Sequence, residues 1–160
     1  MIELTPALED YLETIYLLIE EKRIARIRDI ASKRKVKAAS VSSAMKRLDS
    51  LGLIRYVQRE YIDLTPEGST EARRIIARHQ ALFAFLTDVL QVPAKQAEQD
   101  ACTMEHSVSN ITMQGIEGFL DFLKTFPDGR AGFIEKFRCF SRGGLAPDCS
   151  GSETRSTACA

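Results

Sequence analysis

The feature that most constrains the fold of this 160-residue chain is a change in the spacing of its apolar residues near residue 53. From residue 8 to residue 51 these residues recur every three or four positions, as they do along one side of an α-helix. In LIRYV (53–57) and YIDLT (61–65) they alternate instead, which is typical of short β-strands. The sequence therefore predicts helices followed by a β-hairpin within its first 65 residues.

The helical part of this pattern divides into three segments. Thr5 and Pro6 are typical of a helix start, and a stripe of apolar residues follows them. A second helix is predicted over Arg28 to Lys33, and a third has Ser40 as a candidate cap near its start and ends at Gly52. Three helices and a hairpin in this order predict a winged helix-turn-helix, whose third helix enters the major groove of DNA.

The formal net charge of zero conceals a strongly basic segment. Residues 21–60 contain twelve Lys or Arg and four Asp or Glu, whereas the rest of the chain contains ten and eighteen. Such a block indicates a polyanionic partner, although a solvated basic helix would have the same composition. Hydroxyl and basic side chains share the exposed side of the predicted third helix, as expected for contacts with bases and phosphates. The candidate DNA-contacting residues are Arg28, Lys37, Ala39, Ser40, Ser42, Ser43, Lys46, Arg47 and Arg59.

A long apolar helix is predicted after the hairpin, from residue 66 to residue 91. Its stripe is more apolar than a small domain is expected to bury alone, which indicates a dimer interface. The candidate interface residues are Ile75, Leu82, Phe83 and Leu86. Further helices are predicted over residues 94–109, 112–125 and 132–140.

The predicted fold is mainly α, with an N-terminal winged helix-turn-helix, a small β-hairpin wing and an all-α dimerisation domain. We place the DNA-binding domain at residues 1–71 and the helical domain at residues 72–141. Residues 142–160 contain few apolar residues other than alanine, and we expect this tail to be disordered. The acidic N-terminus and the absence of a long apolar run predict a cytoplasmic protein with no membrane partner.

The segment ACTMEHSVSN (101–110) contains three residue types that bind metals. Cys102, Glu105 and His106 have the spacing i, i+3, i+4, so on a helix a thiol, a carboxylate and an imidazole would share one face. Three ligands from one helix rarely complete a site, so further ligands are expected from other helices. Alternatively, Cys102 is a small buried hydrophobic residue and the Glu-His pair is incidental.

Further ligand types occur on two other predicted helices. The first helix carries Asp10 and Glu13 on its polar side, and the long helix carries His79 within its apolar stripe. His79 has the alternative role of a core residue with satisfied hydrogen bonds. The remaining cysteines, Cys139, Cys149 and Cys159, are spaced too widely for a zinc knuckle, and their role stays open.

Several of these segments together resemble a known family of regulators. They are EDYLETIYLLIEE, RIRDIA, SVSSAMKRLDSLGLI, LTPEG, RRIIARHQALFAFLTDVL and DACTMEH. In combination they resemble the metal-dependent repressors of the diphtheria-toxin-repressor and manganese-transport-regulator type. The resemblance covers residues 5 to about 125.

The resemblance implies a homodimeric repressor that binds palindromic double-stranded operator DNA and controls metal-homeostasis genes. The implied cofactor is Mn²⁺ or Fe²⁺, as one ion or as a binuclear centre between the winged helix and the helical domain. Asp10 and Glu13 resemble the manganese-responsive branch, whereas Cys102 resembles the iron-responsive branch. The implied metal ligands are Asp10, Glu13, His79, Cys102, Glu105 and His106.

Two other classes of protein were weighed against this one. The first is a winged-helix regulator that responds to an organic ligand or to none, with metal playing no part as its effector. The second is a small metallohydrolase, which would need an open coordination position and a general base. Neither HExxH nor GxSxG occurs in the sequence, so we predict that the protein is not an enzyme.

Overall fold

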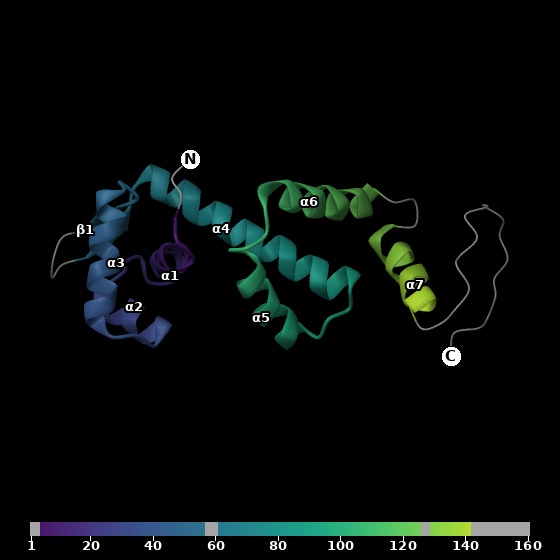
Figure 1. The fold of residues 1–160 in the computed structure, drawn as a ribbon, viewed down its shortest axis with the longest axis horizontal. Helices are drawn as coiled ribbons and strands as arrows, with labels where there is room; N and C mark the ends of the chain where they lie inside the picture. The colour runs from purple at the N-terminus through teal and green to yellow at the C-terminus, as the bar shows by residue number, and fades with distance from the viewer. Residues whose placement is uncertain (1–3, 57–60, 126–128, 142–160) are drawn as a thin grey trace. The chain divides into compact units, whose positions relative to one another are not determined.

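The structure, a computed structural model, describes residues 4–56, 61–125 and 129–141 of the chain. It contains two compact units, the first made of residues 1–80 and 102–106 and the second of residues 81–101 and 107–160. The described helices are α1 (Pro6–Lys22), α2 (Ile27–Arg34), α3 (Ala38–Ser50), α4 (Pro66–Ala84), α5 (Ala94–Met104), α6 (Asn110–Thr125) and α7 (Gly129–Ser141), and the strands are β1 (Ile54–Tyr56) and β2 (Ile62–Leu64) (Figure 1). The predicted boundary between residues 71 and 72 stays a prediction.

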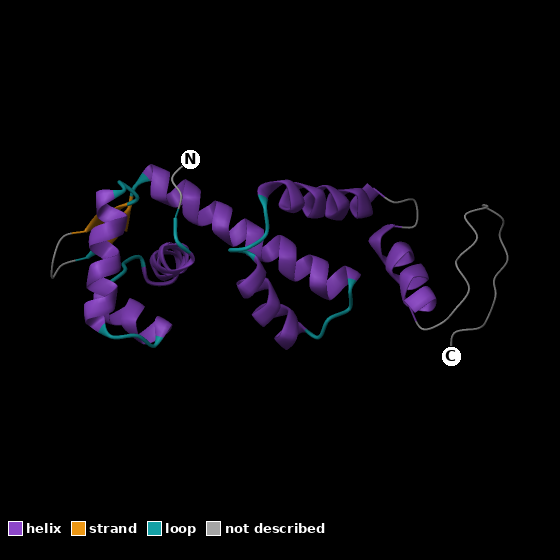
Figure 2. Cartoon of the chain, in the orientation of Figure 1, coloured by secondary structure: helices purple, strands orange, loops and turns teal. Residues whose placement is uncertain are grey.

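The first unit has the predicted winged-helix layout. Helices α1, α2 and α3 pack on one another, and the two strands, orange in Figure 2, lie beside α3. The strands are antiparallel, with Ile54 opposite Leu64 and Tyr56 opposite Ile62. The predicted turn at residues 58–60, including Arg59, lies outside the described residues.

A continuous apolar core holds this unit together. Leu12, Ile15 and Leu18 of α1 are buried together with residues of α2, α3 and both strands, as their helical spacing predicts. Burying each such aliphatic side chain contributes roughly 1.5–3 kcal/mol. The α1 face that does not enter this core is left free to carry polar groups.

Hydrogen bonds and a close backbone contact join the start of α4 to the hairpin. The Thr65 hydroxyl donates to the Gly52 carbonyl at 2.7 Å and accepts the Gly68 N–H at 3.0 Å. Gly68 is required here, because a Cβ at this position would collide with the backbone of Leu53. Two hydrogen bonds of the Thr65 hydroxyl and the close approach of Gly68 to Leu53 therefore connect the wing to the start of α4.

Several helix boundaries differ from the sequence predictions, among them the start of α3 and the end of the long helix. The third helix begins at Ala38 with Lys37 as its N-cap residue, so Ser40 lies inside the first turn and its predicted capping role is wrong. The long helix is α-helical only to Ala84 and continues as a π-helical turn, Phe85–Val89. In that turn the Leu90 N–H reaches the Phe85 carbonyl at 3.1 Å, and the left-handed Gln91, with φ 60°, ends the helix.

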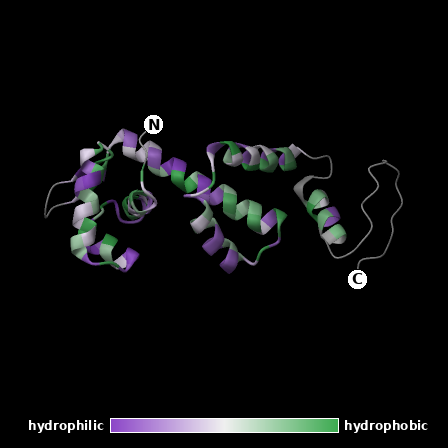
Figure 3. Ribbon diagram, viewed as in Figure 1, coloured by the Kyte–Doolittle hydropathy of each residue, from purple (hydrophilic) through white to green (hydrophobic). Residues whose placement is uncertain are grey.

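The second unit is held by aromatic and aliphatic packing. Val89, Leu123 and Ile134 are buried together, and Phe119 makes edge-to-face contacts with Phe85 and Phe133 at ring-centroid distances of 6.1 and 5.7 Å. Figure 3 shows that α4 changes from mainly hydrophilic near its start to mainly hydrophobic near its end.

The C-terminal helix of the second unit starts earlier than predicted. Helix α7 begins at Gly129 rather than at residue 132, and the predicted tail at 142–160 lies outside the described residues. Within the described residues, every helix is too short or too polar to cross a membrane.

The apolar stripe of α4 is largely buried within the single chain. Ile75 is 2% exposed, Leu82 0% and Leu86 6%, whereas Phe83 is half-buried. The premise that one chain cannot cover this stripe is therefore wrong, because most of it is already covered. The assignment of Ile75, Leu82, Phe83 and Leu86 to a dimer interface stays a prediction.

Candidate metal centre

The polar side of α1 forms one wall of an acidic cluster in the first unit. Its apolar residues enter the core, so Glu9, Asp10 and Glu13 lie on the part of the helix that the core does not use. All three carboxyl side chains are half-buried rather than fully solvated. The Thr14 hydroxyl, bonded to the Asp10 carbonyl at 2.8 Å, is satisfied locally and does not compete for these carboxylates.

His106 links this acidic wall to the segment that follows α5. Its Nδ1 lies 2.6 Å from Oε2 of Glu9, and its Nε2 lies 3.1 Å from Oδ1 of Asp10. The two contacts span 97 and 96 residues of sequence, so only the folded chain brings these groups together. An imidazole can donate from both nitrogens only when it is protonated, and in that form it would place a positive charge between two carboxylates.

Glu105 is the most deeply buried member of the cluster. The residue is 2% exposed, and its Oε2 lies 2.7 Å from Nδ1 of His79 on α4. Its Oε1 is buried without a hydrogen bond, although Nε2 of His106 is 3.3 Å away, because that nitrogen is directed at Asp10. The backbone of Glu105 makes a second contact with α4, because the Arg78 guanidinium donates to the Glu105 carbonyl at 2.8 Å.

The predicted arrangement of Cys102, Glu105 and His106 on one helix is only partly correct. Helix α5 ends at Met104, so Cys102 is on the helix while Glu105 and His106 lie in the turn after it. Cys102 is exposed, which excludes the alternative of a small buried hydrophobic residue.

The pKa shifts in the cluster share one direction. Burial raises the pKa of Glu105 and of Glu13, although the neighbouring histidines oppose this shift. Burial alone would lower the pKa of His106, but the hydrogen bond with Glu9 and the surrounding carboxylates outweigh it and raise that pKa. Burial and the charge of Glu105 also raise the pKa of the Cys102 thiol. Each shift favours the protonated form, as expected where negative charge is in excess.

The donor set fits a divalent cation. One ligand atom each from Asp10, Glu105 and His106 lie within 4.8 Å of one another, and the buried Oε1 of Glu105 has no hydrogen-bond partner. Carboxylate oxygens with an imidazole nitrogen suit Mn²⁺ and Fe²⁺ better than a site made of thiolates would. Besides burial, Glu13 raises and His79 lowers the pKa of Glu105. Burial and the negative charges of Glu105, Asp10 and Glu13 raise the pKa of the Cys102 thiol.

Three residues of the site were not found from the sequence. Glu9 is absent from the predicted ligands, yet it contacts His106 and lies 3.9 Å from Arg74. Arg34 of α2 donates to Oδ2 of Asp10, and Arg74 of α4 pairs with Glu71 at 2.6 Å. The one available signal for Glu9 was its position next to Asp10, and no local pattern points to Arg34 or Arg74.

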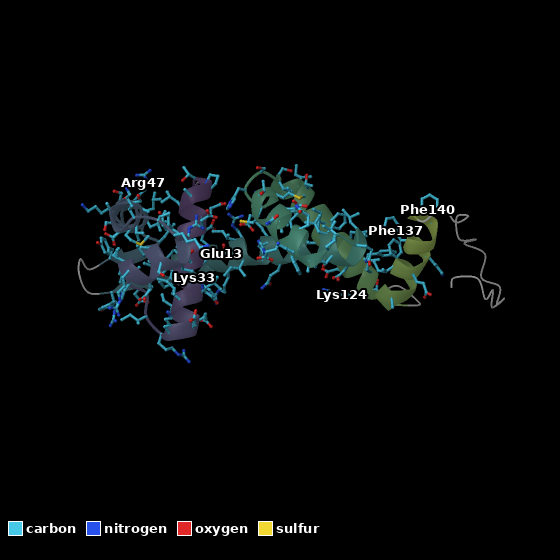
Figure 4. The ribbon with its side chains drawn as sticks, turned by 90° about the horizontal axis from the view of Figure 1, so that it is seen from below. Glu13, Lys33, Arg47, Lys124, Phe137 and Phe140 are labelled. Atoms are coloured by element: carbon cyan, nitrogen blue, oxygen red, sulfur yellow. The ribbon has the colours of Figure 1, made fainter. Side chains whose placement is uncertain are left out.

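The candidate DNA-contacting residues form a separate group in the same unit. Val41, Ala44, Met45 and Leu48 bury one side of α3 in the core. The opposite side of α3 leaves Ala39, Ser40, Ser43, Lys46 and Arg47 exposed and Ser42 half-buried. Arg28 on α2 and Lys37, the N-cap residue of α3, are also exposed, and Arg59 lies outside the described residues. In Figure 4 the labelled Arg47 lies well away from Glu13, so the basic and the acidic groups occupy different parts of the unit.

Comparison with known proteins places both parts of the chain in one family. Residues 3–61 match the N-terminal DNA-binding domain of the iron-dependent repressors, and residues 65–133 match their metal-binding and dimerisation domain. An HTH-type transcriptional regulator of Methanocaldococcus jannaschii is 32% identical over 122 residues, which cover 76% of this chain and 98% of that protein. The HTH-type transcriptional regulator MntR of Listeria monocytogenes is 34% identical over 124 residues, covering 78% and 87%.

A solved structure is similar in both sequence and fold. The manganese regulator SloR has 30% sequence identity to this chain with a TM-score of 0.65. The match covers 76% of this chain and 56% of that one, so the chain spans a little over half the length of this solved structure.

Proposed function

We propose a function that follows from family membership: the chain belongs to the iron-dependent repressor family and acts as a metal-dependent transcriptional repressor. The observation that carries the metal dependence is the convergence of Asp10, Glu105 and His106 within 4.8 Å. Mn²⁺ or Fe²⁺ is the proposed effector, because hard oxygen donors outnumber the single imidazole. This function needs no catalytic step.

Asp10, Glu105 and His106 are the proposed primary ligands, and Glu13, His79 and Cys102 would complete one site or a binuclear centre. When bound, the dication supplies the positive charge that offsets these carboxylates. As a ligand, His106 would present a ring nitrogen lone pair, so a nitrogen that now contacts Glu9 or Asp10 would carry no proton. Since α1 belongs to the winged helix and Glu105 follows α5, the ligand set ties the DNA-binding segment to residues near position 105.

The DNA-binding part of the proposal rests on α3. Its exposed side carries hydroxyl and basic side chains, while its buried side anchors it in the core. In a two-fold symmetric dimer, two copies of α3 would read half-sites about 34–36 Å apart, which requires a palindromic operator. A metal that binds the DNA-competent arrangement more tightly would raise operator affinity by roughly 5–150-fold.

For the homodimer, the second unit offers a face that the long-helix prediction did not include. On α6, Ile111, Gly115, Gly118 and Phe122 recur at helical spacing, and Ile111 is 82% and Phe122 51% exposed. A side chain added at either glycine would meet open space, so another helix backbone has room to approach. This face lies within residues 65–133, the segment that matches the dimerisation domain of the family.

Sedimentation of substituted proteins distinguishes the two candidate dimer interfaces, one on α6 and one on the long helix. We expect Phe122→Asp to shift the protein from dimer to monomer, because it introduces a charge into a contact that excludes water. Lys124→Ala, on an exposed part of the same helix, is the control. If Phe83→Asp dissociates the dimer while Phe122→Asp does not, the interface lies on the long helix instead.

The central experiment measures DNA binding as a function of metal. A pool of random duplexes is selected by the purified protein in the presence of Mn²⁺, and the recovered sequence is then titrated anaerobically with Mn²⁺, Fe²⁺, Zn²⁺ or a chelator. We expect tight binding only with Mn²⁺ or Fe²⁺ and a palindromic consensus. Equal affinity with metal and with chelator would favour the alternative of a winged-helix regulator that does not use metal as its effector.

A further inference from the structure

A fixed positive charge already occupies one side of the acidic cluster. The Arg34 guanidinium, at the last residue of α2, donates to Oδ2 of Asp10, while Oδ1 of the same carboxylate faces His106. Both carboxylate oxygens of Asp10 are therefore engaged with cationic groups of the chain. The side chains of Arg34 and Asp10 are 29% and 20% exposed, so water screens this pair only in part.

The position of Arg34 is set by more than its contact with Asp10. Its guanidinium carbon lies 5.4 Å from the centroid of the Tyr11 ring, a distance typical of cation–π contact. Its Nε is buried without a hydrogen-bond partner. A buried N–H donor without a hydrogen bond lowers the stability of the fold, so the position of Arg34 carries a free-energy cost. The pairing with Asp10 is the contact that offsets this cost.

We propose that Arg34 acts as an internal cation that competes with the metal for Asp10 and so raises the metal concentration needed to activate the repressor. A guanidinium cannot lose its proton, so a dication bound by Asp10 must either displace it or accept a repulsive neighbour a few ångströms away. Arg34 thereby differs from His106, which can release a proton and become a ligand. This inference rests on the proposed metal-dependent function.

Arg34 also connects the site to the helix-turn-helix. It is the last residue of α2, and only residues 35–37 separate it from the start of α3. When Asp10 binds metal, the contact that joins α1 to the end of α2 is weakened next to the recognition helix. Arg34 thus positions Asp10 in the metal-free protein. By the same contact it sets the metal concentration at which Asp10 becomes a ligand.

The test is calorimetric titration of the metal-free, full-length protein with Mn²⁺ in the absence of DNA. We expect Arg34→Met, which keeps the length of the side chain, to tighten Mn²⁺ binding by at least about fivefold. The matched control is Lys33→Met, which removes one positive charge from the adjacent residue; its amine is 3.9 Å from Glu21, and we expect little change. Arg34→Gln keeps a hydrogen-bond donor without the charge and should also bind more tightly.

A double-mutant cycle shows whether Arg34 acts through Asp10. In the Asp10→Asn background we expect Arg34→Met to have no further effect on Mn²⁺ affinity. A second readout is thermal melting, in which Mn²⁺ should raise the Tm of Arg34→Met more than that of the wild type.

Four outcomes would overturn the inference. They are unchanged or weaker Mn²⁺ binding by Arg34→Met, wild-type behaviour of Arg34→Gln, equal tightening by Lys33→Met, and tightening that persists with Asn at position 10. A wild-type protein that binds neither Mn²⁺ nor, under anaerobic conditions, Fe²⁺ would instead refute the proposed function itself.

Discussion

The two charged faces of the first unit hold their charges in different ways. In the acidic cluster, Glu9, Asp10 and Glu105 are at least half-buried and contact histidine or arginine at fixed positions. On the basic face, Lys46 and Arg47 stand on the exposed side of α3. Half-buried charges need a partner inside the protein, whereas exposed charges attract a large polyanion from solution. The same unit can therefore hold a small cation and dock on DNA with separate sets of residues.

The largest expected effect is the loss of a metal ligand. We predict that His106→Ala weakens Mn²⁺ binding by about 100-fold or more, because residues that only support a ligand already contribute ~10–100-fold. Operator binding should then no longer respond to metal, while circular dichroism and dimerisation stay unchanged. Glu117→Ala, which removes an exposed carboxylate from α6, serves as the control. A lower Tm combined with an intact metal response would instead assign His106 a structural role.

Substitutions on the basic face should weaken DNA binding and leave metal binding unchanged. We predict that Lys46→Ala and Arg47→Ala each weaken DNA binding and lower the slope of log K against log salt by ~0.9, while the affinity for Mn²⁺ stays the same. Lys124→Ala, which removes an exposed lysine from the second unit, should leave the slope unchanged. Fluorescence anisotropy at several salt concentrations measures this slope. Identical slopes in the wild type and both variants would remove these two residues from the DNA interface.

A smaller effect is expected at Cys102, which borders the acidic cluster but is exposed. We predict that Cys102→Glu shifts activation towards Mn²⁺ and away from Zn²⁺, because a carboxylate is a harder ligand than a thiolate. Competition between the two metals with a chromophoric chelator measures this preference. Cys102→Ser, which removes the thiol without adding a charge, separates loss of sulfur from gain of a carboxylate. An unchanged preference in both variants would place Cys102 outside the metal centre.

The smallest predicted effect is a pH dependence of the metal-free protein. Because the pKa of His106 is raised above its usual 6.5, its protonated form stabilises the fold, and this contribution is lost as pH rises through the raised value. The raised pKa of Glu105 has the same sign, with the loss beginning above its usual 4.5. The Tm of the chelator-treated protein should therefore fall as pH rises above the usual pKa values of these groups, and His106→Ala should remove most of the fall above pH 6.5. A Tm that rises over this range would contradict the proposed charge state of His106.

The order and type of the elements in the first unit were predictable from local sequence. Helical spacing on α1 and α3 and alternation in β1 and β2 each reflect contacts within a few residues of one another. The predicted boundaries failed where backbone geometry departed from the regular period. The π-helical turn after Ala84 and the end of α5 at Met104 were not predicted, because residue spacing reports the type of an element better than where it ends.

The sequence by itself determined which chemistry is available: a basic block for DNA, and carboxylate, imidazole and thiol groups for metal. The tertiary structure decided which of these groups meet. It brought His106 to Glu9 and Asp10 across more than ninety residues, left Cys102 exposed, and set Arg34 against Asp10. Residue types and periodicity are local properties of the chain. Electrostatic partnership depends on distance in space, and only the packing of α1 against the rest of the first unit fixes that distance.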